Sequence, residues 1–174
     1  AFASHAVRQR IVAIPKNGGS WVDLLKRKDA NTLLTDAMKR IARSGRFGSY
    51  PDVYGRMSWD KPAPTIKREC SHVGNGRYSH PEEDRLCSLR EMAVLQGFPN
   101  DFAFHGSAVS NMYRHIGDAV PPLISYQLAH LCMWMLTGQQ PQVADVLLPG
   151  TNLRRSDVVL TEQENLLYGS RGAQ

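Results

Sequence analysis

Cysteine is scarce in this chain of 174 residues, which has only Cys70, Cys87 and Cys132. The number is odd and no C-x-x-C spacing occurs, so neither a disulfide framework nor a zinc site is indicated. A reducing compartment is therefore the better prediction. Cys87 and Cys132 lie among apolar residues, and we expect them to be packing thiols instead of nucleophiles.

Long apolar runs and sets of metal ligands are lacking as well. The longest apolar stretch, residues 123–136, is interrupted by three polar residues and is too short to cross a bilayer. His72 and His80 are isolated and show no metal-ligand spacing. The sequence therefore predicts neither a membrane span in this stretch nor a metal site or a catalytic histidine.

Positive charge is concentrated in the first part of the chain, although the formal net charge is only +5. Residues 1–70 hold 14 Lys and Arg against 6 Asp and Glu, while residues 71–174 hold 7 against 10. Such a region suits a polyanion, because each Lys or Arg laid on a phosphate releases condensed counterions. A solvated basic face without a partner explains the charge equally well at this point.

A sharply bounded short helix is predicted in the middle of the chain. Ser88 and Glu91 have the spacing of a capping box, in which each side chain takes up a free backbone N–H at a helix start. The helix should begin at Leu89, and Gly97 followed by Pro99 should end it in a left-handed turn.

Apolar residues at helical spacing predict two helices near the start of the chain. We expect a short helix over residues 4–14, ended by Pro15. A second helix should cover residues 31–44, with Asn31 as its cap and Gly45 as its stop.

The last third of the chain is expected to be helical and then irregular. A short helix should lead from residue 108 to Gly117, and a long buried helix should run from Pro122 to Gly138. A short ordered segment is expected at residues 143–148, and disorder beyond about Leu167.

Between these helices the pattern becomes extended. Residues 53–58 and 65–71 are strand candidates. Asn75 and Gly76 predict a type I′ hairpin turn, because both central residues of that turn need positive φ. We therefore expect an α+β fold, with a small strand-rich lobe followed by helices.

Two ordered stretches resemble motifs IX and X of the DNA (cytosine-5) methyltransferases. Residues 85–99 resemble the family's R-x-L-[ST]-x-R-E-x-A-x-L-Q-G-F-P segment, and residues 116–122 resemble I-G-N-A-V-P-P. Residues 54–66 are similar to Y-G-R-M-x-W-D-x-P-A-P-T-I-T, and residues 76–81 to G-R-F-x-H-P. With gaps, the likeness covers most of the chain.

The resemblance implies chemistry that this chain does not supply. In that family a Pro-Cys thiolate attacks C6 of a flipped-out cytosine, a Glu in an E-N-V motif holds the ring, and an F-x-G-x-G loop carries the cofactor. None of the three motifs occurs here, and Glu164-Asn165-Leu166 is a coincidental likeness because it follows motif X. The chain therefore looks like the carboxy-terminal half of such an enzyme, without a catalytic residue of its own.

The resemblance also implies a division of the chain. Residues 1–100 would form the target-recognition region with motif IX, residues 101–138 the motif X helices, and residues 139–174 a partly disordered tail. The motif X helices would pack on a Rossmann-like methyltransferase domain supplied by another chain. That partner would be a larger subunit carrying the Pro-Cys nucleophile.

Candidate DNA contacts lie on or beside the expected hairpin. They share hydroxyl, ammonium or guanidinium groups that could grip phosphates: Lys61, Thr65, Lys67, Arg68 and Arg77. Structural roles compete, because Thr65 also suits a strand and Arg77 could pair with Glu82 or Glu83. The sequence does not show which residue reads a base edge, although Arg paired to guanine is the commonest direct contact.

The cofactor implied by the resemblance is S-adenosylmethionine, held mainly by the missing half. One wall of its pocket would come from Gly117, Asp118, Ala119 and Val120. The family usually carries Asn at the position of Asp118. A carboxylate there brings charge where a neutral amide could both donate and accept a hydrogen bond.

The sequence thus predicts the DNA-binding, target-recognition part of an enzyme that methylates C5 of cytosine in duplex DNA. We expect this chain alone to be inactive, with the catalytic motifs on a partner chain, as in a heterodimer, or on a missing segment. A bacterial restriction-modification system in the cytoplasm is favoured, and a eukaryotic homologue would be nuclear. The alternative is a stand-alone DNA-binding or regulatory remnant of such an enzyme, without catalysis.

Overall fold

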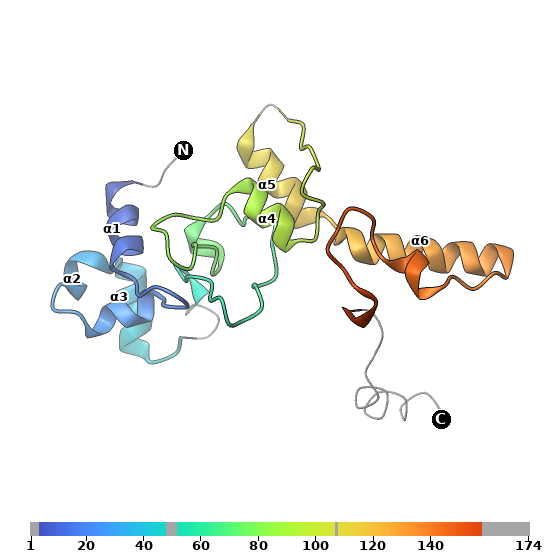
Figure 1. Cartoon of the computed structure of the whole chain (residues 1–174). Coiled ribbons are helices and arrows are strands. Elements are labelled where there is room, and N and C mark those ends of the chain that lie inside the picture. The colour runs from blue at the N-terminus through green and yellow to red at the C-terminus, as the bar shows by residue number, and fades with distance from the viewer. Residues whose placement is uncertain (1–3, 48–51, 107, 158–174) are drawn as a thin grey trace, which may run out of the picture. The chain divides into compact units, whose positions relative to one another are not determined.

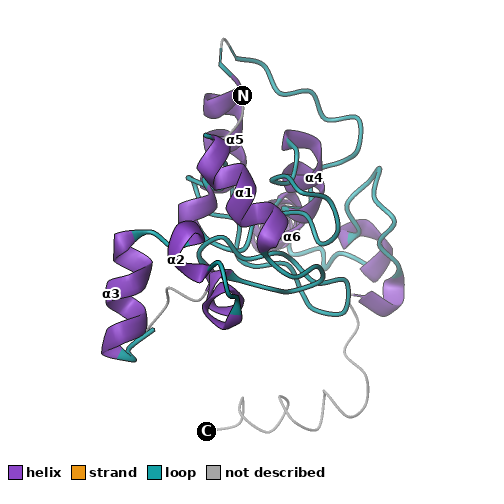
Figure 2. Cartoon of the chain, turned by 90° about the vertical axis from the view of Figure 1, so that its left-hand side faces the viewer, coloured by secondary structure: helices purple, strands orange, loops and turns teal. Residues whose placement is uncertain are grey.

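The computed structural model describes residues 4–47, 52–106 and 108–157. Within these ranges the chain consists of helices and irregular connections and contains no strand (Figure 2). None of the described helices is long and apolar enough to cross a membrane.

Two compact units make up the chain, one of residues 1–96 with 103–118 and one of residues 97–102 with 119–174. Figure 1 shows the elements in chain order. The first unit contains α1 (His5–Ala13), the 3-10 helix η1 (Trp21–Lys26), α2 (Ala30–Leu33), α3 (Asp36–Ser44), η3 (Val73–Asn75), α4 (Leu89–Leu95) and α5 (Val109–Asp118). The second unit contains α6 (Pro122–Thr137), η4 (Val143–Val146) and η5 (Arg155–Asp157).

The amino-terminal helices of the first unit enclose an apolar core. α2 packs against both α1 and η1, and α1, α2 and α3 gather together in Figure 1. Ile11, Ile14, Trp21 and Leu24 are all buried in this core. The predicted helix over residues 4–14 is thereby confirmed as α1.

The single helix expected over residues 31–44 is instead two helices, α2 and α3. Leu34 between them is extended, with ψ of 138°. Thr35, and not Asn31, provides the cap, since its hydroxyl accepts a hydrogen bond of 3.2 Å from the backbone N–H three residues later. A side chain that takes up a free N–H in this way starts a new helix. Gly45 ends α3 as predicted, with φ of +65°.

The capping box of α4 is confirmed. The Ser88 hydroxyl accepts a hydrogen bond of 3.2 Å from the Glu91 N–H, and the Glu91 carboxylate accepts one of 2.6 Å from the Ser88 N–H. Gly97 follows the helix with φ of +90°. Arg85 also pairs with Glu91 at 2.7 Å, and hydrogen bonds from Arg85 lower the pKa of Glu91 to about 2.

The α+β class and the strand-rich lobe are wrong. Only isolated bridges, Arg56 with Ser79 and Ser79 with Leu86, occur in the described part of the lobe. In residues 53–58 the backbone of Tyr54 has φ of +56°, which interrupts an extended run. In residues 65–71 the Cys70 N–H bonds back to the Lys67 carbonyl, which makes a turn.

The hairpin turn at Asn75 and Gly76 is also wrong. Asn75 ends the 3-10 helix η3 and is not among the residues with positive φ, and Gly76 is extended, with φ of 161°. The Asn75 N–H donates to the His72 carbonyl at 3.1 Å, so the segment closes a local turn instead of reversing between two strands.

One buried guanidinium replaces the missing sheet as the centre of this region. Arg56 is fully buried and donates to the carbonyl oxygens of Ile11 and Glu83, each at 2.6 Å, and to those of Ile14 (3.2 Å) and His80 (3.0 Å). It also pairs with the carboxylate of Asp84, which Lys16 contacts too, and these bonds hold the pKa of Asp84 below its usual range. The end of α1 is thereby tied to residues 80–84.

The second unit contains the long helix that was predicted. α6 begins at Pro122 and is followed by Gly138 with φ of +72°. None of its residues is buried, so the described part of the chain does not provide the expected burial. η4 falls within the expected segment 143–148, whereas the tail beyond Leu167 lies outside the described residues.

Arg56→Ala should lower the free energy of unfolding by about 3 kcal/mol or more, because it leaves four carbonyl oxygens without their buried donor. Urea denaturation measures this. Arg8→Ala, at an exposed position of α1, is the matched control and should change stability little. Equal denaturation midpoints for the two variants would contradict the role of Arg56.

Glu91→Gln tests the capping network through its pH dependence. The pKa of Glu91 falls from an ordinary 4.5 to about 2 in the folded chain, so the ionised carboxylate stabilises the fold above pH 4.5. This contribution disappears as the pH drops through 2. The stability difference between wild type and variant should therefore be about 1 kcal/mol near pH 6 and shrink toward pH 2. A stability difference that stays constant with pH would argue against a stabilising role of the ionised Glu91 carboxylate.

Candidate nucleic-acid interface

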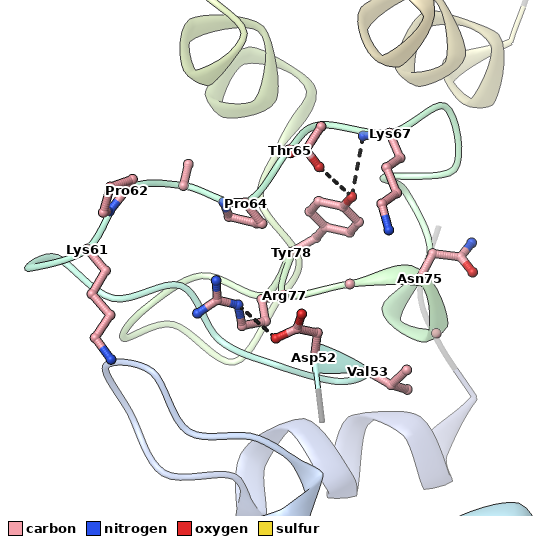
Figure 3. A pocket seen from close by; sticks show the side chains of 13 residues that line it. Asp52, Val53, Lys61, Pro62, Pro64, Thr65, Lys67, Asn75, Arg77 and Tyr78 are labelled. Carbon is pink, nitrogen blue, oxygen red and sulfur yellow. Dashed lines mark hydrogen bonds and ion pairs between the residues drawn. The ribbon is translucent and has the colours of Figure 1, made fainter. Parts of the chain in front are cut away.

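An open hollow of about 740 Å³ lies in the first unit, on the segment where DNA contacts were predicted (Figure 3). Three stretches of chain form it, residues 52–53, 61–67 and 74–78. Prolines at 62 and 64 have no backbone N–H to donate, so this wall cannot pair as a central strand. The irregular backbone that replaces the expected sheet therefore makes the hollow.

Tyr78 fixes the backbone of one wall. Its side chain is 1% exposed, and its hydroxyl donates to the Thr65 carbonyl at 2.9 Å and accepts from the Lys67 N–H at 3.3 Å. Burial raises the pKa of Tyr78 above its ordinary value. At Gly76 a Cβ would lie 2.8 Å from the Tyr78 ring, so a glycine is needed for the ring to occupy this place.

Four of the five predicted DNA contacts line the hollow, namely Lys61, Thr65, Lys67 and Arg77. In the described part of the chain, neither Lys61 nor Lys67 has an ion-pair partner. The hollow thus presents three cationic side chains and one carboxylate, that of Asp52.

Arg77 does not pair with either glutamate that the sequence offered. Its Nε lies 3.1 Å from a carboxylate oxygen of Asp52. Glu82 instead accepts from the indole N–H of Trp59 at 2.8 Å, and Glu83 pairs with Arg85 at 2.8 Å. Asp52 was missed because nothing in its sequence neighbourhood indicates where the chain returns to meet Arg77.

Arg68 does not line the hollow. It pairs with Asp118 at 3.3 Å and with Glu69 at 3.9 Å, and all three side chains are largely exposed. A residue predicted to contact DNA and one predicted to contact the cofactor are thus paired with each other.

Gly117 allows α5 to lie directly on the backbone next to the hollow. A Cβ at this position would lie 2.3 Å from the carbonyl carbon and oxygen of Lys67 and 2.4 Å from the Arg68 nitrogen. The glycine that the sequence assigned to a cofactor wall is therefore required for packing within the chain.

Further contacts hold α5 in place. The Tyr113 hydroxyl donates to the Cys87 carbonyl at 3.0 Å, and the Cys70 thiol donates to the Tyr113 carbonyl at 3.6 Å. Burial raises the pKa of Cys70 to about 11 and that of Cys87 to about 12. Cys87 is a packing thiol as predicted, whereas Cys132 is exposed on α6.

The four predicted cofactor residues are divided between the units. Gly117 and Asp118 end α5 in the first unit, and Ala119 and Val120 belong to the second. Backbone fills the space beside Gly117, and Arg68 pairs with the Asp118 carboxylate. These two residues therefore do not form a cradle for S-adenosylmethionine by themselves. No group of potential metal ligands occurs among the described residues.

The helical fold and the cationic hollow define a surface suited to a polyanion. A profile described as C-5 cytosine-specific DNA methylase matches residues 9–134, which is most of the chain. The chain belongs to this family of DNA methylases, as its motifs predicted. DNA as substrate and S-adenosylmethionine as methyl donor are properties of the family.

Relatives come from bacteria and plants. Type II methylase M.HgiDII of Herpetosiphon aurantiacus is 41% identical over 124 residues, 70% of this chain and 32% of that protein. Type II methyltransferase M1.BsuMI of Bacillus subtilis (strain 168) is 46% identical over 82 residues, 47% of this chain and 19% of that protein. DNA (cytosine-5)-methyltransferase 3 of Arabidopsis thaliana is 32% identical over 127 residues, 68% of this chain and 9% of that protein. The chain spans about a third or less of each relative.

Gly117→Ala should destabilise the chain by about 1 to 3 kcal/mol, because the added methyl overlaps the backbone of residues 67–68. Helix propensity alone predicts the opposite sign, since alanine is favoured over glycine inside a helix. Gly74→Ala is the control, as no atom lies within 4 Å of a Cβ there. Thermal unfolding of both variants measures the difference, and a stabilised Gly117→Ala chain would show that the close approach is absent.

Proposed function

We propose that this chain is the target-recognition part of a DNA cytosine-5 methyltransferase. Residues 1–100 carry recognition, and residues 101–138 complete a catalytic domain whose larger part lies on a partner. The observation that supports this proposal is the hollow, where four predicted DNA contacts meet on a chain of the C-5 cytosine-specific DNA methylase family.

The hollow is chemically suited to a DNA backbone. The ammonium groups of Lys61 and Lys67 lack ion-pair partners in the described chain, so they are available to phosphates. Each phosphate that they neutralise releases counterions and adds affinity without regard to sequence. Holding the duplex is needed in this chemistry, because turning a cytosine out of the stack costs a few kcal/mol.

α6 supports the need for a partner. It is apolar over most of its surface, and Leu128, Leu131, Met135 and Leu136 are 51%, 44%, 78% and 82% exposed. A helix that is apolar all round is normally buried. We assign the catalytic part of the enzyme, on a partner chain or a missing segment, as its cover, since the chain spans only a third or less of its relatives.

The partner also supplies the chemistry. Pro-Cys, E-N-V and F-x-G-x-G motifs do not occur in this sequence. Cys70 and Cys87 are buried with raised pKa values, and a thiol that stays protonated is a poor nucleophile. The nucleophile and most of the S-adenosylmethionine site therefore lie on the partner. In a bacterial restriction-modification system, this enzyme acts in the cytoplasm.

A second candidate is a stand-alone DNA-binding or regulatory remnant of such an enzyme. The ion pair between Arg68 and Asp118 favours it, because the carboxylate at the position of the family's usual Asn is used inside the chain. A remnant would bind duplex DNA but would not respond to a catalytic partner or to S-adenosylmethionine.

Transfer of labelled methyl from S-adenosylmethionine to duplex DNA separates the two candidates. We expect no transfer by this chain alone and transfer when it is mixed with a chain from the same source that carries the Pro-Cys motif. Leu131→Lys on α6 should abolish assembly and transfer, whereas Ser125→Lys, an exposed polar position of the same helix, should retain both. Transfer by this chain alone would refute the division of labour. A silent mixture that still binds DNA would favour the remnant.

A further inference from the structure

The side chain of Arg77 is held at two points, its Cγ and its Nε, whereas the lysines of the same hollow have no ion-pair partner among the described residues. Its stem lies against Gly55, where a Cβ would come within 2.3 Å of the Arg77 Cγ. A side chain at position 55 would therefore displace Arg77. The backbone of Gly55 also donates to the Asp52 carbonyl at 3.0 Å, so one turn holds both the stem of Arg77 and the residue that faces its Nε.

The Nε of Arg77 is held by charge. It is buried and lies 3.1 Å from the Asp52 carboxylate, at an angle that does not make a hydrogen bond. In Figure 3 the two terminal nitrogens point away from Asp52 and into the hollow. Asp52 is the only ion-pair partner of Arg77 within the described residues. The outer edge of the guanidinium is thus available to a ligand while the inner edge is held.

This geometry distinguishes Arg77 from Lys61 and Lys67. A lysine ammonium is a point charge on a flexible stem, which suits phosphates. The arginine guanidinium is a planar fork whose two parallel N–H groups match the O6 and N7 acceptors of guanine in the major groove. A fork that is held in one orientation distinguishes base edges, whereas a mobile charge does not.

We propose that Arg77 is the residue that reads a guanine in the target sequence, and that Asp52 is its positioning residue. This inference rests on the proposed DNA-binding function and assigns a specificity role within it. The lysines of the hollow contribute affinity that is independent of sequence.

Selection of bound duplexes from a random pool by the full chain tests the proposal. Wild type should enrich a site with at least one guanine. Arg77→Lys keeps the charge and most of the stem but loses the fork, and Asp52→Asn loses the charge that orients it. Both should lose the preference at that guanine by about 5- to 150-fold, while retaining affinity for unselected DNA. Lys61→Ala should weaken binding to all sequences alike and leave the preference unchanged.

A second measurement identifies the atom that is read. Replacing the selected guanine with 7-deazaguanine should weaken binding by wild type and leave binding by Arg77→Lys unchanged. Unchanged preferences in both variants would show that Arg77 does not read the guanine. A uniform loss of affinity in Arg77→Lys would show that Arg77 contacts phosphate. Either result would overturn this inference alone. Failure of wild type to bind any duplex would overturn the proposed function and this inference with it.

Discussion

The buried guanidinium of Arg56 is the contact on which the first unit depends. Without a sheet, the carbonyls in the irregular segment need partners other than a neighbouring strand, because an unpaired buried carbonyl costs free energy. Arg56 satisfies two of them, and it also binds two carbonyls at the end of α1 and one carboxylate. It joins the end of α1 to residues 80–84, which closely follow the hollow-lining residues 74–78 in the chain. The candidate interface is therefore built on hydrogen bonds from a side chain to the backbone, not on a ladder between strands.

Features set by local rules were predictable from the sequence. The capping box of α4 and the stops at Gly45 and Gly138 each depend on residues within one or two turns, and each was confirmed. The division of residues 31–44 was missed although its signal, the Thr35 cap, is local. The absence of the expected strands could not be predicted from local rules, because extended residues become a sheet only when distant segments pair. The pairing did not form, since Tyr54 has positive φ and the Cys70 N–H closes a turn onto Lys67.

The sequence predicted which side chains could contact DNA, but not which residues they pair with in the structure. Hydroxyl and cationic side chains pointed to Lys61, Thr65, Lys67 and Arg77, and the structure gathers these four around one hollow. The ion-pair partners of Arg77 and Arg68 could not be predicted, because Asp52 and Asp118 meet these arginines only through tertiary folding. The pairing of Arg68 with Asp118 gives the aspartate a structural role. The negative charge of Asp118 is neutralised by Arg68 within the chain, and an amide at this position would leave Arg68 without this partner.

Gly117 packs against backbone of the same chain, whereas α6 has no buried residue. Gly117 is satisfied internally, since the backbone of residues 67–68 occupies the place of its missing side chain. α6 forms by equally local rules, with proline at its start and glycine after its end, yet it buries none of its residues. Helix formation needs only the sequence of the helix, whereas burial needs a surface of matching size. The first unit therefore contains the backbone on which Gly117 packs, and the apolar helix of the second requires a surface that the described chain does not provide.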